Sequence, residues 1–273
     1  MSIGARTREK QLSSFTSRLR GGRYLAGMQH NSGSEAVLEL LALAGFDFVM
    51  LDMEHASYSF GDVERLVRVA EGCGLVPLVR VNHNDPALIG QALDTGASGI
   101  VVPHIESPDS CRQALSAMRY PPLGMRGKTA GCRSALWGMT PWTEYESWAN
   151  AKTLFVPLVE SSCGVDQIEA IAAVEGVSCI FIGPGDLSHS YGLPGLGLRA
   201  QPVMDAVRRA VAAGRQRDIP VCTVPVPDMD APMVRELLEL GVTVVMWGVD
   251  LVHIGRYFRS ITGSIGSAQP SAE

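Results

Sequence analysis

The chain has 273 residues, 46% of them hydrophobic and 19% charged, so it holds enough apolar material for one sizeable core. Its formal net charge of -5 argues against a nucleic-acid partner, because binding to phosphates requires a basic surface. No apolar run approaches the roughly 20 residues of a membrane span, and the six cysteines form no C-x-x-C pair, so we expect a cytoplasmic protein without a signal segment or a membrane partner.

Short apolar runs alternate along the chain with amphipathic stretches. The runs are rich in Val, Ile and Leu on both faces, as parallel strands covered by helices require. We predict strands at Tyr24–Met28, Phe48–Asp52, Val76–Val81, Gly99–Val102, Leu154–Val159, Cys179–Ile182, Val221–Val224 and Val242–Trp247. We predict helices at Glu35–Ala44, Gly61–Cys73, Pro86–Thr95, Pro108–Met118, Val165–Ala173, Val203–Arg217, Ala231–Leu240 and Leu251–Ile261.

This strict alternation predicts an α/β fold, a single closed (β/α)₈ TIM barrel, a fold that commonly takes about 250 residues. An open doubly wound sheet is the alternative, because a sequence does not show whether a sheet closes. We place the barrel, as the catalytic domain, at residues 23–261, with a lead-in helix over the barrel bottom in residues 1–22 and a loose polar tail in residues 262–273. The long connection Tyr120–Ala151 is expected to overhang the pocket in part.

Polar residues stand at or just beyond the carboxyl ends of the predicted strands, where barrels of this kind hold their active sites. These residues are Asp52, Glu54, His55, Arg80, His104, Glu106, Glu160 and Asp186. Charges that end apolar strands are costly unless they are paired or bind a metal. Their convergence on one mouth predicts an active site and makes a non-catalytic binding or assembly subunit the least favoured class.

Glu160 and Asp186 come from neighbouring strands, so their carboxylates can share one divalent ion. Two carboxylates, completed by water and a bidentate oxygen ligand, suit Mg²⁺, Mn²⁺ or Co²⁺ better than a metal that prefers thiolates. Alternatively, each carboxylate caps a helix or pairs with an arginine, and Asp186 precedes a sequence that suits a helix start.

His55 follows Glu54 and is a candidate general acid or base, with a carboxylate to orient its ring. A hydrogen-bonded structural histidine is the alternative. Arg80 offers a planar guanidinium for a substrate carboxylate, unless it forms a salt bridge to Asp52 or Asp94.

The segment Phe46–Ala56 reads FDFVMLDMEHA and resembles the F-D-x-x-x-x-D-x-E-H-A signature of the 4-hydroxy-2-oxoheptanedioate aldolase family. That family also contains the 2-dehydro-3-deoxyglucarate aldolases and macrophomate synthase. Further blocks of the family are resembled, in order, by Leu78–Val81, Ala92–Ala97, Val101–Pro103, Tyr120–Gly127 and Phe181–Ser188. The likeness runs from about Tyr24 to Ile261.

The resemblance implies a homohexamer, a trimer of dimers that exchange their last helix, and a class II carbon–carbon lyase. Such an enzyme cleaves a 4-hydroxy-2-oxo acid to pyruvate and an aldehyde, or forms it from them, through a metal-bound enolate. The metal would lie on Glu160 and Asp186 and chelate pyruvate, while backbone N–H groups around Gly185 and Asp186 would hold the substrate carboxylate.

The resemblance also assigns the proton chemistry. Arg80 would stabilise the developing enolate, and His55, supported by Asp52 or Asp94, would relay the proton through water. Stabilising charge where it appears in the transition state is consistent with both the metal and Arg80.

Three features depart from the family pattern. Leu158 stands where the family usually has glutamine, Trp247 where small residues are common, and Lys128–Trp137 where a Gly-Ser-Ala run is frequent. We expect Leu158 and Trp247 to line the acceptor side, with Arg126 or Arg133 binding an extra carboxylate. The alternative function is therefore a citrate synthase-like condensation of acetyl-CoA, the acyl partner, with oxaloacetate, as in siderophore biosynthesis.

Overall fold

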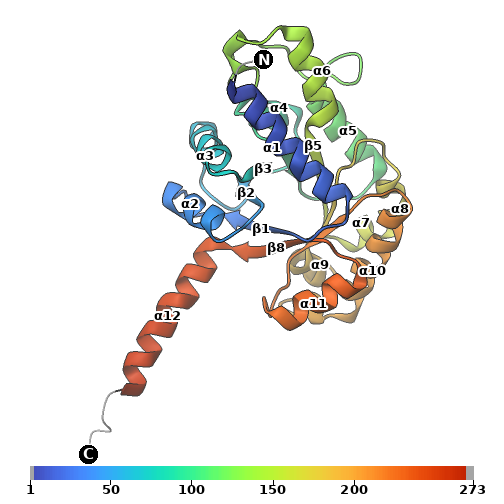
Figure 1. Cartoon of the computed structure of the whole chain (residues 1–273). Helices are drawn as coiled ribbons and strands as arrows, with labels where there is room; N and C mark the ends of the chain where they lie inside the picture. The colour runs from blue at the N-terminus through green and yellow to red at the C-terminus, as the bar shows by residue number, and fades with distance from the viewer. Residues whose placement is uncertain (1–2, 269–273) are drawn as a thin grey trace, which may run out of the picture.

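The structure, a computed structural model, describes residues 3–268 and is a closed barrel of eight parallel strands (Figure 1). The strands are β1 (Leu25–His30), β2 (Phe48–Asp52), β3 (Val76–Arg80), β4 (Gly99–Val102), β5 (Leu154–Val159), β6 (Ile180–Ile182), β7 (Val221–Thr223) and β8 (Val244–Val249). Each strand pairs with the next one in the chain, and β8 pairs with β1. The predicted closed barrel is confirmed, and the open sheet is excluded.

Helices surround the barrel and also cover one of its ends. They are α1 (Ile3–Arg20), α2 (Glu35–Leu43), α3 (Phe60–Cys73), α4 (Pro86–Asp94), α5 (Pro108–Met118), η1 (Leu136–Gly138), α6 (Trp142–Lys152), α7 (Ser162–Asp166), α8 (Ile168–Ala172), α9 (Pro184–Ser190), η2 (Gly197–Arg199), α10 (Gln201–Arg215), α11 (Ala231–Leu240) and α12 (Asp250–Ala268). Within residues 3–268, none of them is both long and apolar enough to span a membrane.

Two predictions of helical structure need correction. The helix expected at Val165–Ala173 is two short helices, α7 and α8, that meet at Gln167. The loose tail expected from residue 262 was wrong for residues 262–268, because α12 continues to Ala268. The rest of that expected tail, residues 269–273, lies outside the described residues.

Strand side chains alternate between the inside of the barrel and the surrounding helices. Phe48 and Met50 of β2 belong to the buried cluster inside the barrel, whereas Val49 and Leu51 belong to the cluster packed under the helices. Gly27 makes room for this interior, since a Cβ there would lie 2.1 Å from the Phe48 ring. The last inward-facing residue of each strand therefore faces the barrel mouth.

Helix α1 lies across the opposite end, the barrel bottom (Figure 1). Its Leu12, Phe15 and Leu19 join the interior cluster from the side where the strands begin. Gln11 Nε2 donates to the Leu75 carbonyl oxygen at 2.8 Å, just before β3. The bottom is therefore closed by apolar packing, and the mouth is the end at which polar chemistry is possible.

The connection Tyr120–Ala151 does not overhang the mouth, contrary to expectation. Arg126 Nη2 contacts Asp94 Oδ1 at 2.7 Å, at the last residue of α4, and Arg133 pairs with Glu71 in the last turn of α3. Helices of such a barrel run opposite to its strands, so both helix ends lie near the bottom. These partly buried ion pairs fix the connection beside the lower end of the barrel.

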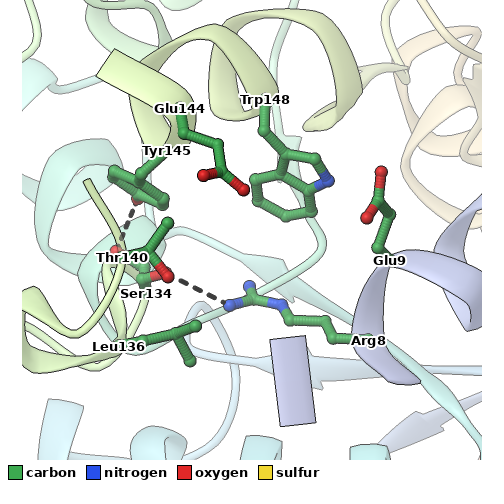
Figure 2. Close-up of a pocket in the computed structure, with 8 residues that line it drawn as sticks. All are labelled: Arg8, Glu9, Ser134, Leu136, Thr140, Glu144, Tyr145 and Trp148. Carbon is green, nitrogen blue, oxygen red and sulfur yellow. Dashed lines mark hydrogen bonds between the residues drawn. The ribbon is translucent and has the colours of Figure 1, made fainter. Parts of the chain in front are cut away.

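Helices α1 and α6 enclose a small cavity there (Figure 2). The Arg8 guanidinium lies 5.2 Å from the centre of the Trp148 ring and donates to the Ser134 carbonyl oxygen at 3.4 Å. Tyr145 Oη donates to Ser134 Oγ at 2.7 Å. The cavity measures about 40 Å³, which is room for little more than one water molecule. It belongs to the packing of the connection and is too small for a substrate.

Candidate functional site

Polar residues gather at the barrel mouth because each ends the inward-facing series of its strand. Gln29, Asp52 and Arg80 continue the inward alternation of β1, β2 and β3, and Glu160 does so directly after β5. Strands β2 and β3 are paired in register, with Asp52 opposite Arg80. The strand sequences alone thus place a carboxylate beside a guanidinium in a buried layer.

Asp52 is fully buried and accepts hydrogen bonds from three side chains. Arg80 donates from Nε to Oδ1 and from Nη2 to Oδ2, both at 2.8 Å, while Gln29 Nε2 and Asn31 Nδ2 reach Oδ2 at 2.7 and 3.3 Å. Burial on its own raises the pKa of Asp52, but the Arg80 guanidinium and two backbone N–H groups offset it and hold the pKa below the usual value. Asp52 is therefore ionised and fixed in place.

Arg80 is held by carboxylates on two sides and is only 6% exposed. Its Nη1 lies 3.1 Å from Glu54 Oε2, in addition to the two bonds with Asp52. Burial lowers the pKa of Arg80, whereas the bonds to Asp52 and the charges of Asp52, Glu54 and Glu160 raise it above its usual value. The salt bridge to Asp52 that the sequence left open is present, and the one to Asp94 is not formed, since Asp94 binds Arg126.

The sequence places His104 among the polar residues of the mouth without giving it an individual role, and the structure places it between two site carboxylates. Its Nδ1 lies 3.2 Å from Glu160 Oε1 and its Nε2 lies 3.4 Å from Glu54 Oε1. Its backbone N–H donates to Glu160 Oε1 at 3.0 Å from a left-handed conformation, with φ of 54°. The position of His104 just after β4 was a signal in the sequence that this residue belongs to the site, but a lone histidine is more often structural than functional.

Glu160 and Asp186 form the acidic side of the mouth. The pKa of Glu160 is raised to about 7: burial is the largest cause, the backbone N–H and the charge of His104 oppose it, and the negative charges of Asp186 and Glu54 add to it. The charge of Asp186 is therefore felt at Glu160 as a repulsion. A divalent cation between them would relieve that repulsion, so the donor set fits a hard metal ion.

Two carboxylates alone would make an incomplete set of ligands for a metal ion. Among residues 3–268 there is no group of three or more His, Cys, Asp and Glu side chains arranged to hold a metal. An ion on Glu160 and Asp186 would therefore need water or substrate oxygens as further ligands, which is usual for Mg²⁺. The alternative that Asp186 caps a helix is wrong, because Gly183 is the N-cap of α9 and Asp186 lies within its first turn.

Gly183 leaves the space in which the Glu160 carboxylate lies. A Cβ at Gly183 would stand 3.0 Å from both Cβ and Oε2 of Glu160 and 3.1 Å from Cδ1 of Leu158. Contacts of that length force a neighbour to move. A glycine at this position therefore matters for the orientation of a candidate metal ligand.

His55 lies at the edge of the mouth, with 60% of its side chain exposed. Its Nε2 is 3.8 Å from Glu54 Oε2, and its backbone N–H donates to Asp52 Oδ1 at 3.4 Å. Asp94, expected as a possible support for His55, lies at the far end of α4 and does not face the mouth of its own chain. Glu54 and Asp52 are the carboxylates that the structure brings to His55.

The three residues expected on the acceptor side are not together. Leu158 faces the barrel interior, but it is 1% exposed and lies in the interior cluster beneath the mouth. Trp247 lies on the outer face of β8, because Met246 takes the inward position, and its Nε1 donates to Tyr24 Oη at 2.7 Å. Arg126 is at the barrel bottom. Within one chain, Trp247 and Arg126 therefore do not line the mouth.

Comparison with known proteins extends over the whole barrel. A model of the family described as HpcH/HpaI aldolase/citrate lyase matches residues 25–256. The hydroxypyruvate/pyruvate aldolase of Deinococcus radiodurans is 36% identical over 256 residues, which are 92% of this chain and 89% of that protein. An HpcH/HpaI aldolase/citrate lyase family protein of known structure, from Burkholderia cenocepacia J2315, is 36% identical with a TM-score of 0.85, over 92% of this chain and 98% of that one. The structure of the citrate synthase SbnG is 27% identical with a TM-score of 0.79, over 93% and 96% of the two chains.

Proposed function

The chain belongs to the HpcH/HpaI aldolase/citrate lyase family and is an aldolase-type lyase, and from this premise we propose that it is a divalent-metal-dependent enzyme. It would cleave a 4-hydroxy-2-oxo acid to pyruvate and an aldehyde, and catalyse the reverse condensation. The observation that carries this proposal is the Arg80 guanidinium, fixed by two carboxylates at the same mouth as the Glu160 and Asp186 pair.

Glu160 and Asp186 would hold the metal ion, Mg²⁺, Mn²⁺ or Co²⁺. When bound, that ion supplies Lewis acidity toward the keto oxygen of a 2-oxo acid. Gly185 and Asp186 lie in the first turn of α9, where backbone N–H groups lack intrahelical acceptors, and these groups would receive the substrate carboxylate.

Arg80 would stabilise the negative charge that develops on the substrate oxygen when a proton leaves the methyl carbon. Its three contacts with Asp52 and Glu54 fix it before substrate binds, so little reorganisation is needed during the reaction. His55 is exposed and close to Glu54, which suits a group that passes a proton to or from water.

The test is formation of aldol product from pyruvate and short aldehydes such as glycolaldehyde, followed by mass spectrometry with metal-loaded protein. We expect product with the unaltered protein and none with Glu160→Gln. Glu169→Gln is the matched control, because Glu169 pairs with Arg209 on the exterior and should leave the reaction unchanged. Metal-loaded protein that gives no aldol product from any aldehyde tested would contradict the proposal.

A second candidate is the condensation of acetyl-CoA with oxaloacetate, and the likeness to the citrate synthase SbnG together with Leu158 favours it. Release of free thiol from acetyl-CoA that depends on oxaloacetate would support this candidate. The location of Arg126 and Arg133 at the barrel bottom weighs against it, because neither faces the mouth of its own chain to bind the second carboxylate.

We also propose a homohexamer whose subunits exchange α12, located in the cytoplasm. In support, α12 projects away from the barrel (Figure 1), and it exposes apolar side chains at Leu251, Val252, Tyr257, Phe258 and Ile261. Six cysteines with free thiols suit a reducing compartment. Sedimentation equilibrium should give the mass of six chains, and the mass of one chain would contradict the assembly.

A further inference from the structure

Asp250, the first residue of α12, joins the end of β8 to the loop that follows β1. It is 3% exposed, and its carboxylate accepts from the backbone N–H groups of Asn31 at 2.9 Å, Ser32 at 3.3 Å and Leu251 at 2.7 Å. His30 Nδ1 lies 2.8 Å from Asp250 Oδ2, and the His30 side chain is completely buried. One carboxylate therefore fixes the backbone of two strand ends to each other.

Tyr58 holds the same loop from its other side. Its hydroxyl accepts from the Gly33 N–H at 2.8 Å and donates to the His30 carbonyl oxygen at 3.1 Å. Its ring stacks on the His30 ring, with 6.4 Å between centroids and 26° between planes. The loop after β1 is thus restrained by Asp250 and Tyr58 together, and not by its own backbone.

This loop reaches the site through one side chain. Asn31, whose backbone N–H binds Asp250, donates from Nδ2 to Oδ2 of Asp52 at 3.3 Å. Asp52 Oδ2 is also the acceptor for Arg80 Nη2 at 2.8 Å. A continuous series of contacts therefore runs from Asp250 through Asn31 and Asp52 to the Arg80 guanidinium.

We propose that Asp250 is a positioning residue for Arg80, acting through Asn31 and Asp52. The inference rests on the proposed function, since it assigns Arg80 to the enolising step. When the Asp250 carboxylate is present, it orders the Asn31 backbone, so the Asn31 amide meets Asp52 Oδ2, the oxygen that also accepts from Arg80 Nη2. When the carboxylate is weakened, Asn31 gains freedom, and Asp52 and Arg80 lose one of the contacts that define their orientation.

The same contacts explain why the helix begins where it does. The Asp250 carboxylate stands at the amino end of α12, where it is favoured by the unpaired backbone N–H groups and the helix dipole. It also pairs with His30 from β1. The start of α12 and the geometry of Arg80 are consequently set by one group.

The experiment is a double-mutant cycle with Asp250→Asn, Asn31→Ala and the two combined. Asp230→Asn is the matched control, because Asp230 is likewise a helix-start carboxylate, accepting from Met233 N at 2.9 Å at the start of α11, without a link to Arg80. The activity readout is deuterium exchange into the methyl group of pyruvate, corrected for the folded fraction. The second readout is the ¹⁵N–¹H signal of Arg80 Nε and its rate of exchange with solvent.

We expect each single variant to slow pyruvate exchange about tenfold, as loss of a supporting contact commonly does, with the KM for pyruvate nearly unchanged. The double variant should be no slower than the slower single variant, because both act along one series of contacts. The Arg80 Nε–H signal should shift and exchange faster in both single variants, and not in Asp230→Asn.

The inference would be overturned if the double variant slowed pyruvate exchange by the product of the two single-variant factors. An Arg80 Nε–H signal that is unchanged in Asp250→Asn would also overturn it. Lower stability with an unchanged signal is what a purely structural role of Asp250 predicts. The signal is measured without any reaction. A protein that fails to exchange pyruvate protons but shows the signal change therefore contradicts the proposed function and supports the positioning role.

Discussion

Replacing Arg80 with lysine tests whether the fixed guanidinium is what the mouth provides to catalysis. Arg80 makes two bonds of 2.8 Å to Asp52 and one contact of 3.1 Å to Glu54, and a lysine ammonium cannot reproduce the bidentate pair. The hydrogen bond that the oriented guanidinium is proposed to give to the developing enolate is charge-assisted, and its loss raises the barrier by about 1.5–3 kcal/mol. Because 1.4 kcal/mol corresponds to about a factor of ten, the rate of pyruvate proton exchange should fall about 10- to 100-fold.

The assay is ¹H NMR of the pyruvate methyl group in D₂O, with kcat and KM determined separately. Loss of a contact that is made only in the transition state lowers kcat and kcat/KM together. The control is Arg209→Lys, since Arg209 also binds a carboxylate bidentately, Glu169 at 2.6 and 2.7 Å, but on the exposed exterior where such pairs contribute about 0–1 kcal/mol. Exchange at the unaltered rate in folded Arg80→Lys would refute the role of the guanidinium.

Three further predictions concern the parts around the mouth. Gly183→Ala should weaken Mn²⁺ binding about tenfold in titration calorimetry, because the added Cβ would lie 3.0 Å from Glu160 Oε2; unchanged affinity would contradict the role given to Gly183. Arg133→Met should lower the Tm by several degrees, since it breaks the partly buried pair with Glu71, yet leave pyruvate exchange intact; slower exchange in folded protein would place the connection at the site after all. The pKa of Asp250 is lowered from 3.8 to about 2: burial opposes this shift, and the bonds from His30, Asn31 and Ser32 cause it. The resulting stability is present above pH 4 and is lost as the pH falls toward 2. Urea unfolding should therefore show a difference in the free energy of unfolding of about 2 kcal/mol between the unaltered protein and Asp250→Asn at pH 6, and this difference should narrow by pH 2. A difference that stays constant with pH would contradict the assignment.

The fold was predictable because its signals are local. β2, β4 and β5 have the bounds that their apolar runs predicted, and the strict alternation of strands and helices favoured a closed barrel without excluding an open sheet. Side chains alternate along a strand, so Leu158 lies on the same inward face as Glu160. The same rule sends Trp247 outward, because Met246 faces inward.

The candidate site was predictable in its strand-end residues and not in its loops. Asp52, Arg80 and Glu160 end strands, so sequence position fixes where they lie. Arg126 and Asp94 bind each other at the barrel bottom, a choice of partner that depends on how the long connection folds back and has no local signal. His104 is brought between Glu54 and Glu160 by its left-handed backbone conformation, which residue type alone does not indicate.

The central claim is that Glu160 and Asp186 hold a divalent ion on which removal of a proton from pyruvate depends. The most direct test is the rate of deuterium exchange into the pyruvate methyl group with metal-stripped protein, before and after addition of Mg²⁺, Mn²⁺ or Co²⁺. We predict exchange at the solvent background in stripped protein, recovery on addition of metal, and no recovery in Glu160→Gln. The same rate with and without metal, or full recovery in Glu160→Gln, would contradict it.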